Sequence, residues 1–181
     1  ALTGLRPVVE MRVVDFALCA IDEIVNQAAK NRFMFGGQGR VPLVARMPSG
    51  IWTASAAQHS QSLYWMTTGI PGLKTVIPSN PADAKGLLLA AIRDDDPVIF
   101  CEAKGVLMQR GEVPEGDYTN AIGQAKGVRA GGDVTLVTYG ASLWRCVAAA
   151  EALAAGGIDA EIIDLRSLRP LDDAAILASV R

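Results

Sequence analysis

Residues 74–101, KTVIPSNPADAKGLLLAAIRDDDPVIFC, carry the pattern that decides the fold. The apolar residues of 74–77 and 97–101 predict two strands, and the second is apolar enough to be buried on both faces, as strands of parallel sheets are. Residues 81–92 predict a helix that begins at Pro81, because proline is tolerated in a first turn, where its missing N–H is not needed. A strand, a helix and a second strand are the repeating unit of α/β proteins, so this stretch predicts a parallel sheet.

The same alternation continues on both sides of this stretch. Further strands are expected at residues 6–14, 41–46, 134–139 and 158–165, and further helices at 16–30, 58–68, 141–155 and from Pro170 onward. Asp15 is expected to cap the first of these helices. Periodicity fades over residues 102–133, which we interpret as an inter-domain connection. The chain is therefore predicted to contain two α/β units built on parallel sheets.

Composition excludes several classes of protein. The chain has 181 residues, a net charge of −2 and no basic stripe, so a nucleic-acid partner is not expected. Its three cysteines (Cys19, Cys101 and Cys146) are odd in number and lack CxxC spacing, which favours a reducing, cytosol-like compartment. No apolar run approaches the roughly 20 residues that span a bilayer, and no secretory signal is evident. Because the chain starts at Ala1 and ends within a helical pattern at Arg181, we interpret it as part of a longer protein.

His59 is the only histidine, in the string AAQHSQS after a glycine-containing loop. At the start of an expected helix it could face a cleft and serve as a proton donor or as a hydrogen-bond donor to a developing oxyanion. Taken alone, the residues favour an ordinary histidine at a helix start with no chemical task over this role. Ser60 beside it does not indicate a hydrolase, because there is no GxSxG elbow and no triad.

Two other motifs invite a ligand and are better explained without one. Gly36, Gly37 and Gly39 follow a helix and precede a strand, whereas a dinucleotide fingerprint requires the reverse order, so a turn is predicted. The run Asp94-Asp95-Asp96 ends a helix, where anions are disfavoured and adjacent carboxylates cannot all face one ion. We interpret it as a solvated turn, although carbonyl oxygens freed at that helix end could bind a monovalent cation.

Several strings taken together are far more specific than any one of them. They occur in one order: IDEIVNQAAK (21–30), FGG (35–37), AAQHSQS (56–62), IPGLK (70–74), DAKGLL (83–88), IRDDDPV (92–98) and LRSLRPL (165–171). The chain thereby resembles the beta subunit of the thiamine-diphosphate-dependent decarboxylase component of 2-oxo acid dehydrogenase complexes. The strings IFCE (99–102) and EVPEG (112–116) favour the pyruvate and acetoin members.

The resemblance implies a transketolase-like pyrimidine-binding domain at residues 1–111, lacking its start. It implies part of a transketolase C-terminal domain at residues 112–181. Phe16 matches the aromatic that packs on the aminopyrimidine ring of thiamine diphosphate, a use that ring stacking makes physically reasonable. His59 matches the family's active-site histidine. The resemblance further implies a potassium site made of main-chain carbonyls, which maps to Leu43, Ala91, Ile92, Asp94 and Asp96.

The resemblance also implies partners. The alpha subunit would hold magnesium and the cofactor's diphosphate in an α2β2 heterotetramer, the beta chains would form a homodimer, and a dihydrolipoamide acyltransferase would accept the acyl group. The enzyme would lie in a bacterial cytoplasm or a mitochondrial matrix. The family's activating glutamate precedes Ala1, and Trp52, Gly69 and Leu107 depart from the family pattern. These departures leave two alternatives, a non-catalytic scaffolding module and another transketolase-like enzyme.

Overall fold

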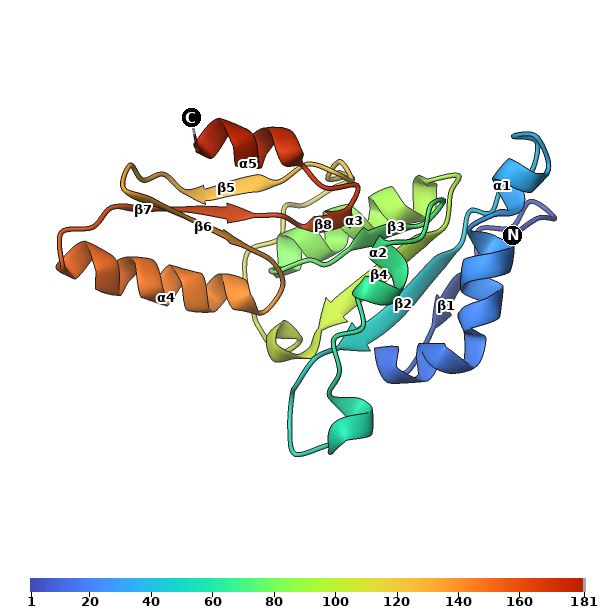
Figure 1. The fold of residues 1–181 in the computed structure, drawn as a ribbon, viewed down its shortest axis with the longest axis horizontal. Helices are drawn as coiled ribbons and strands as arrows, with labels where there is room; N and C mark the ends of the chain where they lie inside the picture. The colour runs from blue at the N-terminus through green and yellow to red at the C-terminus, as the bar shows by residue number, and fades with distance from the viewer. Residues whose placement is uncertain (181) are drawn as a thin grey trace.

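The computed structural model describes residues 1–180 and arranges them around two sheets (Figure 1). The five-stranded sheet has the order β1 (Val8–Glu10), β2 (Val44–Ser49), β4 (Val98–Ala103), β3 (Lys74–Val76) and β8 (Ser167–Arg169). The three-stranded sheet has the order β5 (Lys126–Arg129), β7 (Ala160–Asp164) and β6 (Val134–Thr138). The α-helices are α1 (Asn31–Met34), α2 (Trp65–Thr68), α3 (Pro81–Arg93), α4 (Ser142–Ala155) and α5 (Asp173–Ser179).

The predicted β–α–β unit is confirmed as β3, α3 and β4. Strand β4 is central and pairs in parallel with both β2 and β3, and β1 pairs in parallel with β2. Helix α3 begins at Pro81, and the side chain of Asn80 caps it by accepting a hydrogen bond from the backbone N–H of Asp83 at 2.9 Å. Local signals therefore sufficed to define this unit.

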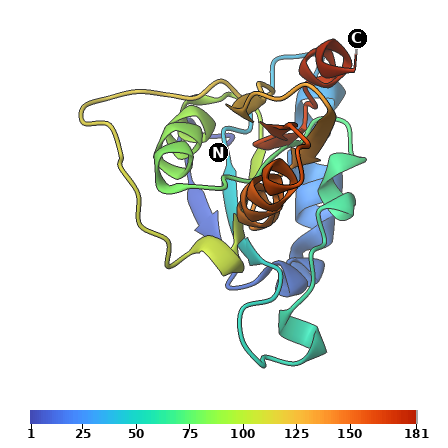
Figure 2. The same cartoon turned by 90° about the vertical axis from the view of Figure 1, so that its left-hand side faces the viewer.

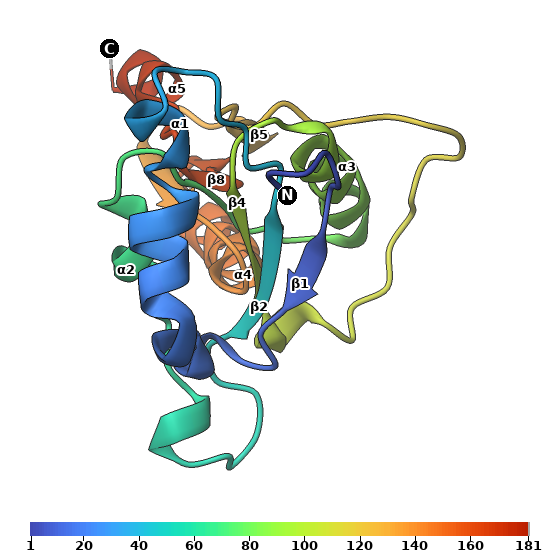
Figure 3. The same ribbon diagram turned by 90° about the vertical axis from the view of Figure 1, so that its right-hand side faces the viewer.

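The larger sheet is covered on both faces, which explains its apolar strands. Along β4, Val98 and Phe100 point to the face covered by α3, whereas Ile99 and Cys101 point to the opposite face. A long helical segment from residue 14 to residue 34 covers that opposite face (Figure 3). The alternation of side chains along each strand thus fills two separate cores.

The helix expected at residues 16–30 differs from the structure in its details. It is a succession of a 3₁₀ segment (Val14–Ala20), a π-helical segment (Glu23–Ala28) and α1. The prediction that Asp15 caps it is wrong: Val13 occupies that position, and Asp15 is buried. The helix expected at 58–68 is also wrong, because only the 3₁₀ turn Ala57–His59 and the short α2 form there.

Gly72 of the IPGLK string explains how that turn packs against the helical segment. Its φ is +94°, and a Cβ atom built on it would lie 2.0 Å from the carbonyl oxygen of Ala29. Only glycine allows the two backbones to approach so closely. The string therefore fixes the distance between the helical segment and the strand that follows, β3.

The C-terminal half is less regular than predicted. Strands β6 and β7 are parallel and joined by α4, as expected, but β5 pairs with β7 in the antiparallel direction. Strand β8 was not predicted and adds an antiparallel edge to the first sheet through β3. The last helix begins at Asp173 rather than at Pro170, because the side chain of Asp172 caps it by accepting from the N–H of Ala175. The sheets are therefore mixed and not purely parallel.

Residues 107–125, between the 3₁₀ turn that follows β4 and strand β5, form a long connection that passes outside α3 (Figure 2). It is held to that helix where the Tyr118 hydroxyl donates to the carbonyl of Ala82 and the N–H of Asn120 donates to the carbonyl of Gly86. Within residues 1–180, none of the helices combines the length and the apolar character needed to cross a bilayer.

The two halves meet through a buried ion pair. Arg166, just after β7, contacts Asp83 of α3 at 3.1 Å and donates to the carbonyl oxygens of Gln124 and Ala125. Beside it, Asp164 is fully buried, and burial raises the pKa of its carboxyl group to about 6. One of its oxygens accepts from the N–H of Arg166, whereas the other has no hydrogen-bond partner among the described residues.

Candidate active site and cation site

The candidate active site lies at the carboxyl edge of the parallel strands. Strands β2 and β4 end at Ser49 and Ala103, and the loops that follow them carry His59 and Lys104. The 3₁₀ segment that carries Phe16 follows β1 at the same edge. Ligands of α/β proteins are usually bound at this edge, because successive loops converge there.

The structure brings Phe16 and His59 into direct contact. Their ring centroids are 5.2 Å apart and their planes meet at 83°, an edge-to-face arrangement that aromatic rings favour. Phe16 keeps 42% of its surface exposed, and His59 is exposed as well. An exposed aromatic ring beside an exposed imidazole offers a stacking surface next to a proton donor.

Two side chains to which the sequence analysis gave no role at this site fix the position of the His59 segment. Lys104 is buried and its ammonium group donates a hydrogen bond to the backbone carbonyl of His59. Asp15 is also buried and accepts from the side chain of Gln61 at 2.8 Å. The His59 segment is thereby held from β4 on one side and from the Phe16 segment on the other. The role of Lys104 and Asp15 as supports is recognised from the burial of their charged side chains. Burial depends on the tertiary structure, so the sequence alone could not indicate it.

Tyr64 provides a third support at this edge. Its hydroxyl lies 2.9 Å from the hydroxyl of Ser49, the last residue of β2, and its ring meets that of Tyr139 edge-on at 5.8 Å. Burial raises the pKa of Tyr64, so its hydroxyl stays protonated. Because Tyr139 follows β6, this contact connects the C-terminal half to the edge that carries His59.

The groups at this edge suit the aminopyrimidine end of thiamine diphosphate, which needs a stacking surface and hydrogen-bonding partners. The exposed face of Phe16 is a suitable stacking surface, and the second carboxylate oxygen of Asp15 is buried without a partner among the described residues. Trp52 and Ile51 are exposed in the loop that precedes His59, by 58% and 75%. Phe16 and His59 themselves remain exposed despite the departure from the family pattern at Trp52.

The second candidate site lies at the opposite, amino edge of the sheet. The turn of Asp94, Asp95 and Asp96 joins the end of α3 to the start of β4. Its interpretation as a merely solvated turn is wrong, because every carboxylate has a basic partner. These pairs are Lys74 with Asp94 at 2.6 Å, Arg6 and Arg40 with Asp95 at 2.6 and 2.7 Å, and Arg32 with Asp96 at 2.5 Å.

The predicted carbonyl ligands surround this turn. One Arg6 nitrogen donates to the carbonyl oxygens of Ile92 and Asp94, at 3.2 and 2.7 Å. The carbonyl of Leu43 accepts from the N–H of Val98, and that of Ala91 accepts from the N–H of Asp94. Two of the carbonyls thus converge on one positive charge, which is the geometry that a cation requires. The guanidinium group lies where a cation that bound these two carbonyls would lie.

Comparison with known proteins agrees with this organisation. The family models that match are "Transketolase, pyrimidine binding domain" over residues 1–109 and "Transketolase, C-terminal domain" over residues 123–181. A solved structure titled "Split gene transketolase, inactive beta4 tetramer" superposes with a TM-score of 0.80 at 23% identity, covering 99% of this chain and 55% of that one. At that identity the likeness shows the fold alone.

Two relatives are much more similar in sequence. The beta subunit of acetoin:2,6-dichlorophenolindophenol oxidoreductase from Cupriavidus necator is 53% identical over 99% of this chain and 53% of its own length. The beta subunit of the pyruvate dehydrogenase E1 component from Rhizobium meliloti is 50% identical over 100% of this chain and 40% of its own length. The chain spans about half the length of these relatives. It belongs to the transketolase pyrimidine-binding domain family, with a transketolase C-terminal domain following in the same chain.

Proposed function

We propose that this chain is part of the beta subunit of a thiamine-diphosphate-dependent 2-oxo acid or acetoin dehydrogenase. The whole enzyme would cleave pyruvate or acetoin and pass the acyl group to lipoamide. The observation that carries the proposal is the contact between Phe16 and His59 at the carboxyl edge of the sheet. Support also comes from the relatives, which are named as beta subunits of an acetoin and a pyruvate dehydrogenase.

Each residue of the pair would have its own task. Thiamine diphosphate, when bound, supplies a centre that stabilises a carbanion. The exposed face of Phe16 would stack on the aminopyrimidine ring and so orient it. The imidazole of His59 would donate a proton or a hydrogen bond where negative charge develops on the substrate. Lys104, through the carbonyl of His59, would keep that imidazole in place.

The alpha subunit would complete the site by holding magnesium and the diphosphate. The carbonyls of Leu43, Ala91, Ile92, Asp94 and Asp96 would form a monovalent cation site, for which potassium is our proposal. Such an ion would fasten the end of α3 to the residue that precedes β2. The same proposal places the enzyme in a bacterial cytoplasm or a mitochondrial matrix.

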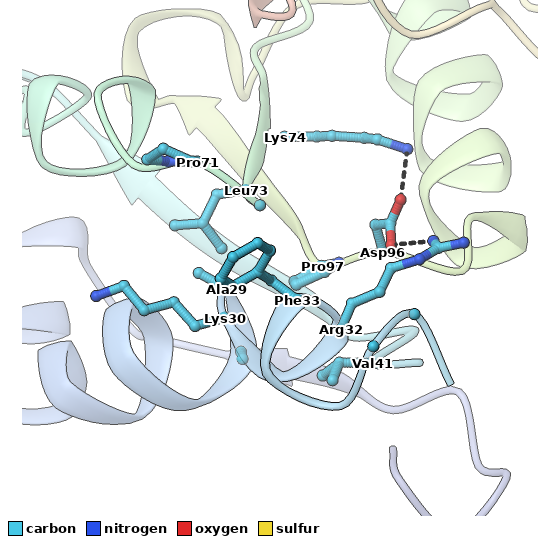
Figure 4. Close-up of a pocket in the computed structure, with 14 residues that line it drawn as sticks. Ala29, Lys30, Arg32, Phe33, Val41, Pro71, Leu73, Lys74, Asp96 and Pro97 are labelled. Carbon is cyan, nitrogen blue, oxygen red and sulfur yellow. Dashed lines mark hydrogen bonds and ion pairs between the residues drawn. The ribbon is translucent and has the colours of Figure 1, made fainter. Parts of the chain in front are cut away.

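An apolar groove beside α1 supports the proposed assembly. It has a volume of about 920 Å³ and is lined by apolar and small residues, including Ala29, Phe33 and Leu73. Figure 4 shows Phe33 among its lining residues and the pairs of Arg32 and Lys74 with Asp96 at one side. Phe33 is 89% exposed. Exposure of a large apolar side chain to water is unfavourable, and burial in an interface would remove it from water.

We propose that a second copy of the chain covers this groove in a β2 homodimer within an α2β2 enzyme. A projecting Phe33 and a groove on the same face allow the self-complementary contact that a two-fold axis requires. Sedimentation should show a dimer for the chain and a monomer for Phe33→Asp. The control is Trp52→Asp, which changes an exposed aromatic outside the groove. A wild-type monomer at tens of micromolar, a range typical of such contacts, would contradict the dimer.

The catalytic proposal is tested with the complete beta subunit. Co-expressed with its alpha partner, it should reduce 2,6-dichlorophenolindophenol in the presence of acetoin or pyruvate, and thiamine diphosphate should bind the pair. The 181-residue chain alone should give no calorimetric signal with magnesium and cofactor, because much of the binding energy lies in the partner's share of the pocket. Cofactor binding without activity in the complete enzyme would favour the scaffolding alternative that Trp52 suggests. Micromolar binding by the chain alone would contradict a pocket shared between subunits.

A further inference from the structure

Among the basic residues paired with the aspartate turn, Arg6 also donates to backbone carbonyls at the end of α3. Its guanidinium nitrogen Nη1 donates to the carbonyls of Ile92 and Asp94, and Nη2 pairs with the carboxylate of Asp95. Arg40 shares that carboxylate at 2.7 Å. The carbonyls at a helix C-terminus lack partners within the helix and carry partial negative charge, so they attract cations.

The space in front of these two carbonyls is already filled. Nη1 lies 2.7 Å from one oxygen and 3.2 Å from the other, so an ion that bound both oxygens would have to take the place of the guanidinium group. The charges around the turn lead to the same conclusion. Three carboxylates face four basic side chains, so an additional cation would enter a site that already carries a net positive charge; the four are Arg6, Arg32, Arg40 and Lys74.

Arg6 can nevertheless leave without exposing an unpaired charge. Its side chain is 42% exposed, so it can move into solvent, and Asp95 would keep its ion pair with Arg40. The two carbonyls would then be free for an ion. Arg6 precedes β1 by two residues, and β1 leads into the 3₁₀ segment that carries Phe16. Replacement of Arg6 by an ion would therefore release the residue that precedes β1, the strand that leads to the candidate active site.

We propose that Arg6 and a monovalent cation are alternative occupants of the Ile92 and Asp94 carbonyls. This inference rests on the proposed cation site. In the absence of the ion, Arg6 closes the turn with its own charge, and at high potassium concentration the ion displaces it. The intact chain is accordingly stabilised only weakly by potassium, whereas a chain without the guanidinium group depends on it.

The test compares melting temperatures in KCl and in choline chloride at equal ionic strength, because choline is too large for a ring of carbonyls. The proteins are the wild type, Arg6→Gln and Arg40→Gln; the last removes a cation from Asp95 but touches neither carbonyl. For Arg6→Gln we expect KCl to raise the melting temperature by about 2–4 °C, through mass action on the folded state. For the wild type and Arg40→Gln the rise should be less than half as large.

The two ways of failing are distinguishable. If potassium raises the melting temperature of the wild type as much as that of Arg6→Gln, the two cations do not compete, and the inference is wrong while the cation site stands. If potassium has no effect on Arg6→Gln, the carbonyls bind no ion, and both the site and the inference are wrong. Should Arg6→Gln not fold, Arg6→Met replaces it with the same two outcomes, since methionine keeps a flexible apolar stem but has neither charge nor donor.

Discussion

The buried ammonium group of Lys104 donates its hydrogen bond to the backbone carbonyl of His59. Lys104 directly follows β4, and His59 ends the 3₁₀ turn in the loop after β2. This bond ties the backbone of His59, which follows one parallel strand, to the end of another. The position of His59 beside Phe16 is therefore a property of the sheet and not of the His59 loop alone.

Replacement of Lys104 by methionine should loosen the His59 segment without unfolding the protein. Methionine keeps the apolar stem but cannot donate a hydrogen bond, and such a bond contributes about 1.5–3 kcal/mol when its donor is charged. Hydrogen–deuterium exchange of residues 56–61 should become faster. The control is Lys85→Met, which removes a lysine that donates to the carbonyls of Pro114 and Gly116. Equal exchange in wild type and Lys104→Met would show that the bond does not hold the segment.

His59→Ala in the complete enzyme should lower the rate of acyl transfer far more than the affinity for thiamine diphosphate. A positioned proton donor typically contributes a factor of ~10²–10⁴ to the rate, whereas the ring of Phe16 remains available for stacking. Stability should change little, because His59 is exposed.

The informative control for this variant is Phe16→Ala, which should weaken cofactor binding more than His59→Ala does. The assays are transfer to a lipoyl domain, reduction of an artificial acceptor and calorimetric titration of the cofactor. Normal rates for His59→Ala in both activity assays would show that the histidine has no chemical task. A fall in melting temperature with a proportionate loss in every assay would instead assign it a structural role.

Gly72→Ala should be strongly destabilising. The new Cβ would lie 2.0 Å from the backbone oxygen of Ala29, and φ at this position is +94°. We expect a loss of about 2–5 kcal/mol from the strained backbone and the displaced helical segment together. Gly116→Ala is the matched control, since its φ is +74° and its Cβ would meet nothing within 4 Å. Its expected cost is about 1–2 kcal/mol. Equal losses in urea denaturation would show that the contact with Ala29 is not decisive.

Asp164→Asn should stabilise the protein at neutral pH and change its pH dependence. Burial raises the pKa of Asp164 from 3.8 to about 6, so the folded state binds a proton that the unfolded state releases between these values. Its favourable contribution is complete below pH 3.8 and is lost as pH rises through 6.

At pH 8 the variant should therefore be more stable than the wild type by about 3 kcal/mol, and near pH 4 the two should be similar. Urea denaturation across this range measures the difference. The exposed Asp117→Asn serves as the control and should follow the wild-type curve. A constant difference between Asp164→Asn and wild type at all pH values would contradict a burial effect on ionisation.

Some of the molecule could be predicted because its signals are local. Pro81 and the helical periodicity after it defined α3, and the apolar runs on either side defined β3 and β4. The ordered strings indicated transketolase-type domains, which the matches over residues 1–109 and 123–181 confirm. The domain boundary at residues 111 and 112 stays a prediction, as do the roles of Phe16, His59 and the carbonyl ligands.

The tertiary structure alone decided the rest, since it depends on residues that are distant in the chain. Strand β8 is a short edge strand, and only its pairing with β3 defines it. Asp15 reads as a helix cap in the sequence, but burial beside Gln61 makes it a support for the His59 segment. The three aspartates at 94–96 read as solvated until Arg6, Arg32, Arg40 and Lys74 are placed around them. Sequence determined which residue types were available and the order of the elements; the packing of the sheet decided which of them meet, because electrostatic and hydrogen-bonding energies depend on distance.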